Sequence, residues 1–180
     1  MQDRYDPDIH RRRSRRLKGY DYSQAGAYFI TICTRNRECT FGDVIDGEML
    51  SNEAGHIVME EWMKSADIRG EIELDAFAVM PNHVHGIIVI TDRCRGVWPY
   101  APTGTLRSPS RTTGAFVRGF KSACTLHINQ MHNARGTPVW QRNYYEHVIR
   151  DEDDLNRIRE YILDNPARWE EDEENPRRIS

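Results

Sequence analysis

Two histidines separated by a single residue open an aliphatic run, HVHGIIVI, at residues 83–90. Side chains of a strand alternate between its two faces, so we expect His83 and His85 to point the same way and Val84 the opposite way. Two imidazoles about 7 Å apart on one face of a sheet can share a divalent metal ion. The alternative is a pair of ordinary polar residues near a strand end, and this segment alone leaves both interpretations open.

A second pair of residues that can take part in chemistry lies near the C-terminus. Tyr161 and Asn165 are four residues apart, so on a helix they share one face, one turn from each other. A tyrosine hydroxyl, with a reference pKa of about 10, is a weak nucleophile until a metal or a base assists it. An amide oxygen is a reasonable ligand for a hard cation such as Mg²⁺ or Mn²⁺. His83, His85 and Asn165 can therefore hold a metal ion, while Tyr161 faces a phosphate that this ion binds. The plainer alternatives are a tyrosine at the edge of the core and an asparagine that ends a helix.

The charge of the chain is unevenly distributed. The sequence has 180 residues and a formal net charge of −3, yet residues 11–18 are almost all basic and residues 170–174 are all acidic. A basic arm is typical of proteins that bind a polyanion such as nucleic acid, whereas an acidic tail usually solubilises and can also compete with DNA for a basic groove. We divide the chain into a basic arm (1–26), one catalytic domain (27–169) and an acidic tail (170–180).

Cysteine spacing and hydropathy exclude several classes of protein. Cys33, Cys39, Cys94 and Cys124 show no C-x-x-C spacing, which argues against a structural zinc site of that type and favours reduced, mostly buried thiols. The N-terminus is hydrophilic and lacks the apolar core of a signal peptide. No apolar run approaches the roughly 20 residues that cross a bilayer. We expect a soluble, cytoplasmic protein with no membrane partner.

Hydrophobic periodicity and turn residues predict the elements that must position these groups. They indicate strands over 28–34, 74–80, 84–90 and 144–149, a hairpin over 41–50 around Asp46-Gly47, and helices over about 51–68, 113–130 and 151–165. Residues 91–112 are predicted to be a mobile, cationic loop. This order predicts an α+β fold: a ferredoxin-like antiparallel sheet with helices on one face, the hairpin as an insertion, and a C-terminal tyrosine-bearing helix.

Six segments in a fixed order carry a resemblance to a known family. They are RRLKGYDYS at 15–23, YFIT at 28–31, MPNHVH at 80–85, GFKS at 119–122, WQRNYYEH at 140–147 and YILDNP at 161–166. Each is modest alone, but together they are highly specific, and the resemblance covers most of the chain. The sequence resembles the REP-associated tyrosine transposases, a branch of the HUH single-strand endonucleases with one catalytic tyrosine.

The resemblance implies a role for each candidate residue. His83 and His85 match the histidine pair that binds Mg²⁺ or Mn²⁺ and polarises the scissile phosphate. Tyr161 matches the nucleophile that forms a 5′-phosphotyrosine bond and releases a 3′-hydroxyl. Asn165 takes the place where related insertion-sequence transposases have a glutamine as third metal ligand, and its reach is one methylene shorter. The implied activity is DNA transposition by a monomer or homodimer that cuts single-stranded DNA beside an imperfect, REP-like hairpin.

Basic residues are the expected DNA contacts, because arginine and lysine neutralise backbone phosphates. The candidates are Arg11, Arg12, Arg13, Arg15, Arg16, Lys18, Arg118 and Lys121, together with the arginines of the 91–112 loop. Tyr20, Tyr22 and Tyr100 can stack on unpaired bases. Ordinary surface charge is the alternative for each basic residue.

Two other functions remain open at this point. One is a non-catalytic DNA hairpin-binding regulatory protein derived from a transposase, and the other is a metal-dependent hydrolase that uses water, with Tyr161 merely structural. Tyr144 and Tyr145 are rival nucleophiles, but they begin a short strand and lack an amide four residues further on in a helix. The intact set of two histidines, tyrosine and asparagine favours the enzyme, since a pure binding protein has no need of all four.

Overall fold

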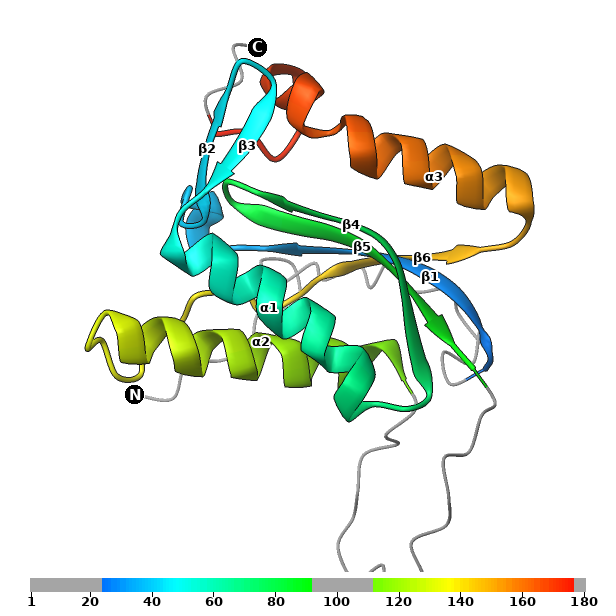
Figure 1. Cartoon of the computed structure of the whole chain (residues 1–180), viewed down its shortest axis with the longest axis horizontal. Coiled ribbons are helices and arrows are strands. Elements are labelled where there is room, and N and C mark those ends of the chain that lie inside the picture. Colours follow the sequence, from blue (N-terminus) through cyan, green and yellow to red (C-terminus); the bar gives the residue numbers. More distant parts are fainter. Residues whose placement is uncertain (1–23, 92–111, 177–180) are drawn as a thin grey trace, which may run out of the picture.

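The protein is built around a four-stranded antiparallel sheet with helices on both faces (Figure 1). The computed structural model describes residues 24–91 and 112–176. The strands are β1 (Gly26–Cys33), β4 (Ile72–Met80), β5 (His83–Ile90) and β6 (Tyr145–Ile149), in the order β4-β5-β1-β6. The helices are α1 (Glu53–Ile68) and α2 (Thr113–Met131) on one face and α3 (Glu152–Asp164) on the other.

The topology confirms the predicted ferredoxin-like α+β fold. Chain order β1-α1-β4-β5-α2-β6 combined with this sheet order is a split β-α-β arrangement, and all neighbouring strands are antiparallel. The hairpin of β2 (Gly42–Ile45) and β3 (Glu48–Ser51) is inserted between β1 and α1. Its turn residues Asp46 and Gly47 both have positive φ, 52° and 79°, as the Asp-Gly signal predicts.

Each helix begins at a polar side chain that accepts a backbone hydrogen bond. Asn52, Thr112 and Asp151 cap α1, α2 and α3, each accepting from the amide three residues further on. The first turn of α3 also has three acidic residues, which suit the positive end of the helix dipole. These local rules explain why the predicted helix boundaries are confirmed to within a few residues.

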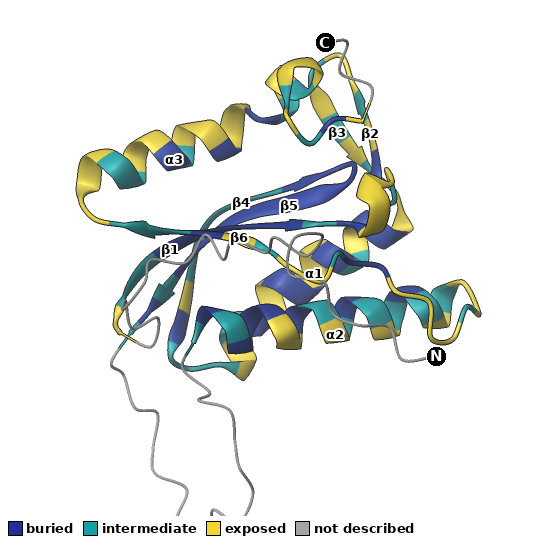
Figure 2. Ribbon diagram, turned by 180° about the vertical axis from the view of Figure 1, so that it is seen from behind, coloured by how far each residue is buried: buried dark blue, intermediate teal, exposed yellow. Residues whose placement is uncertain are grey.

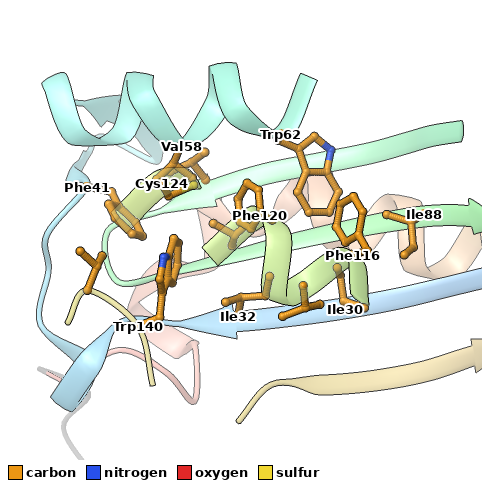
Figure 3. Packing of buried hydrophobic residues seen from close by; sticks show 14 of the residues in the cluster. Ile30, Ile32, Phe41, Val58, Trp62, Ile88, Phe116, Phe120, Cys124 and Trp140 are labelled. Carbon is orange, nitrogen blue, oxygen red and sulfur yellow. The ribbon is translucent and has the colours of Figure 1, made fainter. Parts of the chain in front are cut away.

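The sheet separates two hydrophobic clusters. The larger one lies between the sheet and α1 and α2 and centres on Trp62, whose ring stacks on Phe77 at 4.7 Å and meets Phe116 and Phe120 edge-on (Figure 3). The smaller cluster fastens α3 to the opposite face and consists of Phe29, Ile87, Ile158 and Ile162. The outer surface of α3 is largely exposed (Figure 2). The candidate tyrosine helix is therefore held by only a few apolar contacts.

Gly86 on β5 is required by the packing of Trp62. A Cβ added there would lie 2.3 Å from Cζ2 and 2.4 Å from Cη2 of the indole. We expect Gly86→Ala to lower the free energy of unfolding by about 1–3 kcal/mol, because overpacking a close-packed core displaces neighbouring side chains. Urea denaturation of the purified variant measures this change.

Gly119→Ala is the matched control for that substitution. Its Cβ would approach the end of the Arg69 side chain, with Nη2 nearest at 3.0 Å, and alanine is the better helix former in α2 by about 1 kcal/mol. We expect the control to be as stable as the wild type or more so. A Gly86→Ala protein of unchanged stability would show that the Trp62 ring can move aside.

Several sequence-based expectations fall outside the described residues. They include the basic arm up to residue 23, Cys94, and residues 92–111 of the cationic loop predicted over 91–112. Within the described ranges, Cys33, Cys39 and Cys124 are free thiols, and of these only Cys124 is fully buried, so the expectation of mostly buried thiols is too broad. In the same ranges, no helix is long and apolar enough to cross a membrane.

Candidate metal and tyrosine site

The two histidines lie at the start of β5 and face α3, as the alternation of the strand predicts. His83 pairs with Cys33 of β1, and His85 pairs with Thr31. Val84 between them belongs to the cluster on the opposite face. Both imidazoles are buried, with 0% and 2% of their surface exposed.

Asn82, in the tight turn before β5, fixes the tautomer of His83. Its Nδ2 donates to the carbonyl oxygens of Arg37 at 3.1 Å and Glu174 at 2.7 Å, which turns Oδ1 toward Nδ1 of His83 at 2.8 Å. An amide oxygen only accepts hydrogen bonds, so Nδ1 of His83 has the proton. In the neutral ring, Nε2 of His83 then keeps the lone pair that a metal needs.

His85 completes a pair of converging nitrogens. Its Nδ1 lies 2.9 Å from Oγ1 of Thr31, a hydroxyl that can donate or accept and therefore serves either tautomer. The two Nε2 atoms are 2.9 Å apart. Burial lowers the pKa of His83 to about 4 and the pKa of His85 well below its usual value, so both rings are neutral near pH 7. Neutral imidazoles are the form that binds a cation.

Asp172 joins this pair from the C-terminal segment. Its Oδ2 is 3.8 Å from Nε2 of His83, and ligand atoms of the two histidines and Asp172 all lie within 4.8 Å of one another. Oδ2 of Asp172 and Oδ1 of Asn165 are buried and hydrogen-bond to none of the described residues. Buried polar atoms without partners are costly, and two imidazoles, an amide and a carboxylate suit a divalent cation. The residues at this site therefore fit a metal ion.

The sequence reasoning missed Asp172, because it treated residues 170–180 as a solubilising tail. The short helical turn η2 (Pro166–Glu171) reverses the chain after α3 and brings Asp172 back to β5. The ring of Trp169 lies 6.0 Å from that of His83, and its carbonyl accepts from the side chain of Asn175. In a run of five acidic residues, nothing local marks which carboxylate turns inward.

Tyr161 points from α3 toward the histidine pair. Its hydroxyl is 3.3 Å from Nε2 of His85, and its ring meets Phe29 edge-on at 6.0 Å. The side chain is 43% exposed. Burial, with the nearby charge of Asp172, raises the pKa of Tyr161 to about 12, so the phenol is protonated near pH 7. The structure thus brings together all four residues that the sequence proposed, His83, His85, Tyr161 and Asn165.

An ion pair fixes the rotation of α3 about its axis. The guanidinium of Arg159 donates to both carboxylate oxygens of Asp75 on β4, with Nε 2.8 Å from Oδ1. This contact, with a backbone bond from Ala76, holds the pKa of Asp75 below its usual value. Because Tyr161 lies two residues from Arg159, a helix anchored in this way keeps its hydroxyl directed at the histidines.

A cavity of about 840 Å³ opens in front of Tyr161. Its walls are Phe29, Thr31, His85, Tyr145, Tyr161, Asn165, Arg168 and residues 170–174. The acidic segment is held there by Arg37, which pairs with Glu174 at 3.0 Å and donates to the carbonyl of Glu173. The described part of the predicted tail is therefore one wall of the candidate site.

The predicted DNA contacts are not gathered at this cavity. The basic residues from Arg11 to Lys18 lie outside the described residues. Arg118 is exposed on α2, on the sheet face away from the histidines. Burial lowers the pKa of Lys121 to about 8, and its Nζ donates to the carbonyls of Gln141 and Asn143. Lys121 thus supports a loop instead of presenting its charge at this cavity.

The two rival tyrosines lie in different surroundings. Tyr144 packs against the larger core, and its hydroxyl donates to Glu146 at 3.1 Å. Tyr145 lines the cavity near Tyr161 and contacts the ring of Phe29 at 6.1 Å. In the described structure it is the hydroxyl of Tyr161 that contacts the histidine pair.

Comparison with known proteins gives the relationship. No family model matches the chain. An uncharacterized protein of Haemophilus influenzae is 42% identical over 96% of this chain and 98% of its own length. A protein of the same organism assigned as a REP-associated tyrosine transposase is 25% identical over 82% of this chain and 74% of its own. A solved REP-associated tyrosine transposase bound to a REP hairpin shares the fold, with a TM-score of 0.57, 21% identity, and 83% and 72% of the two chains covered. This chain therefore shares its fold with a solved REP-associated tyrosine transposase and is similar in sequence to a protein assigned to that family.

Proposed function

We propose that the protein is a metal-dependent single-strand DNA endonuclease and strand transferase that uses Tyr161 as its nucleophile. The observation that carries the proposal is the position of the Tyr161 hydroxyl, 3.3 Å from Nε2 of His85 and at the edge of a buried donor set that fits a divalent cation. Similarity to a protein assigned as a REP-associated tyrosine transposase supports a DNA function of this type.

The residues divide the chemistry between them. His83, His85 and Asn165, with Asp172 as a further carboxylate, would hold Mg²⁺ or Mn²⁺, which supplies positive charge to the non-bridging oxygens of the scissile phosphate. Tyr161 attacks the phosphorus in line with the leaving 3′ oxygen. The phenol gives up its proton to water, the bond from phosphorus to the 3′ oxygen breaks, and the leaving oxygen takes a proton from water, so that a 5′-phosphotyrosine and a free 3′-hydroxyl result.

The covalent intermediate permits strand transfer. A phosphotyrosine diester conserves the energy of the broken phosphodiester, so a second 3′-hydroxyl can attack it and reseal the strand without ATP. Buried, neutral histidines suit this cycle, because they gain no positive charge near pH 7 and remain ligands throughout.

Single-stranded DNA with imperfect, REP-like hairpins is the proposed partner. The solved relative is bound to a REP hairpin. In this proposal residues 27–169 form the catalytic domain together with the acidic segment that supplies Asp172. The basic arm before them contacts DNA phosphates, and the protein acts as a monomer or homodimer.

The test is covalent capture of DNA. Full-length protein is incubated with end-labelled single-stranded DNA that contains a hairpin and Mn²⁺, and the products are separated on a denaturing gel. We expect a protein–DNA band that EDTA abolishes. Binding without any covalent band, across a panel of hairpins, would contradict the enzyme and support the non-catalytic hairpin-binding protein.

A further inference from the structure

A second cavity lies at the end of β1, the strand in which Cys33 pairs with His83. It has a volume of about 420 Å³ and is lined by Arg35, Asn36, Pro138, Trp140, Gln141 and Arg142. The backbone of its first wall is joined to the turn that holds His83, since Thr34 donates to the carbonyl of Asn82 and the Asn82 side chain donates to the carbonyl of Arg37. We refer to it as the two-arginine cavity.

Two segments that are distant in the sequence are joined by backbone hydrogen bonds to form this cavity. The amide of Arg35 donates to the carbonyl of Val139 at 2.8 Å, and the amide of Gln141 donates to the carbonyl of Cys33 at 2.9 Å. Thr34 and Trp140 form an isolated antiparallel bridge between these bonds. The backbone on both sides of each arginine is therefore fixed.

Arg35 and Arg142 differ from several other arginines of the described structure, which pair with a carboxylate. Arg37, Arg157, Arg159 and Arg168 each pair with a carboxylate within the chain. Among the described residues, no carboxylate forms an ion pair with Arg35 or Arg142, although both line one cavity. Two arginines that line one cavity offer it two positive charges, and the planar fork of arginine suits phosphate.

The turn that presents Arg35 is in an unusual conformation. Asn36 and Arg37 both have left-handed φ, 56° and 58°, which costs free energy for residues with a Cβ. The hydrogen bond from the Asn82 side chain to the carbonyl of Arg37 holds this conformation. Strain of this kind is kept at functional turns when the surroundings determine it fully.

Lys121 supports the opposite wall. Its ammonium donates to the carbonyl of Gln141 at 2.8 Å and to that of Asn143 at 2.9 Å, the residues on either side of Arg142. Lys121 is thus a positioning residue for the loop that presents Arg142. This gives one purpose to the segments GFKS and WQRN, neither of which supplies a ligand atom to the histidine site.

We propose that the two-arginine cavity binds a backbone phosphate of the single-stranded DNA next to the scissile nucleotide, with Arg35 and Arg142 as its ligands. The proposal rests on the proposed function, because it assigns the strand that leaves the tyrosine site to the two-arginine cavity. Pro138 and Trp140 line the same cavity and offer apolar surface against which the sugar of that nucleotide can pack.

The binding test separates this cavity from the chemistry. Fluorescence anisotropy in EDTA, in a Tyr161→Phe background, measures affinity for labelled hairpin DNA with single-stranded flanks at several salt concentrations. We expect Arg35→Gln and Arg142→Gln each to weaken binding about 10-fold, and the double variant to reduce the salt slope by about 0.7, the value for one phosphate of a single strand. Arg150→Gln, which removes the same charge at the far end of β6, leaves both quantities unchanged.

A second measurement locates the phosphate. Oligonucleotides in which one phosphodiester at a time is replaced by a neutral methylphosphonate are bound to the wild type and to the double variant. We expect one position beside the cleavage site that weakens the wild type and has no effect on the double variant.

The outcomes distinguish the two proposals. Variants that bind as tightly as the wild type, with the same salt slope, would overturn the cavity and leave the tyrosine chemistry intact. A wild-type protein that binds no hairpin DNA would overturn both. Circular dichroism melting of each variant shows whether a loss of affinity reflects unfolding, and Arg142→Lys, which keeps the charge but not the fork, is expected to fall between wild type and Arg142→Gln.

Discussion

Tyr161→Phe abolishes the covalent protein–DNA complex and leaves hairpin binding unchanged: this is the largest effect we expect. The substitution removes only the hydroxyl that lies 3.3 Å from Nε2 of His85, and the ring keeps its edge-on contact with Phe29. Loss of a nucleophile lowers rates by several orders of magnitude, so adduct formation should fall at least about 10⁴-fold. A denaturing gel with Mn²⁺ measures the adduct, and an anisotropy titration measures binding.

Tyr145→Phe is the matched control. It removes one hydroxyl from the same cavity, and Tyr145 also contacts Phe29, but in the described structure it is the Tyr161 hydroxyl that lies against the histidine pair. We expect the control to form the adduct at the wild-type rate. Metal-dependent cleavage that persists in Tyr161→Phe would instead support the hydrolase that uses water, with Tyr161 as a structural residue.

The part of the site that sequence could predict is the part that local geometry determines. The alternation of β5 places His83 and His85 on one face, and the four-residue spacing in α3 places Asn165 one turn from Tyr161. Each rule acts within one element, and its result is seen in the structure. Tertiary packing decides which face of the sheet α3 covers. The side of α3 that is buried can still be predicted, because charged residues occupy the other side and leave one apolar stripe.

The part that sequence could not predict depends on contacts between distant segments. Asp172 reaches His83 only because η2 reverses the chain, and Asn82 orients His83 only because the carbonyls of Arg37 and Glu174 orient Asn82. Lys121 was expected to contact DNA, yet two carbonyls of a loop twenty residues away accept from its ammonium. Composition and periodicity contain no information on such partners.

His85→Ala is expected to abolish Mn²⁺ binding by the full-length protein, with a loss of affinity of at least about 100-fold. Its Nε2 is 2.9 Å from that of His83, so the variant lacks one of the two converging nitrogens. Isothermal titration calorimetry measures the affinity directly, and Mn²⁺ should raise the melting temperature of the wild type alone, because a ligand that binds only the folded state stabilises it. A melt in EDTA shows whether the variant is folded.

Asp172→Asn tests whether the C-terminal segment supplies a metal ligand. The change keeps the shape of the side chain and removes its charge. We expect Mn²⁺ affinity to fall about 10- to 100-fold, a loss as large as that found when a residue that hydrogen-bonds to a metal ligand is replaced. Glu170→Gln, an exposed neighbour in the same segment, removes the same charge and should leave the affinity unchanged. If both variants bind Mn²⁺ equally weakly, the acidic segment acts only through its overall charge. If both bind it as tightly as the wild type, Asp172 is not a ligand.

Hydrogen exchange extends this test to the fold of the segment. The amide of Asn175 donates to the carbonyl of Asp172, and the carbonyl of Glu174 accepts from Asn82, so a cation bound by Asp172 and the histidines would fasten the segment to β5 at a further point. Mn²⁺ should then slow amide exchange over residues 172–175 in the wild type and in Glu170→Gln, but not in Asp172→Asn. Because exchange is measured without DNA, this result assigns the ligand independently of any nuclease activity.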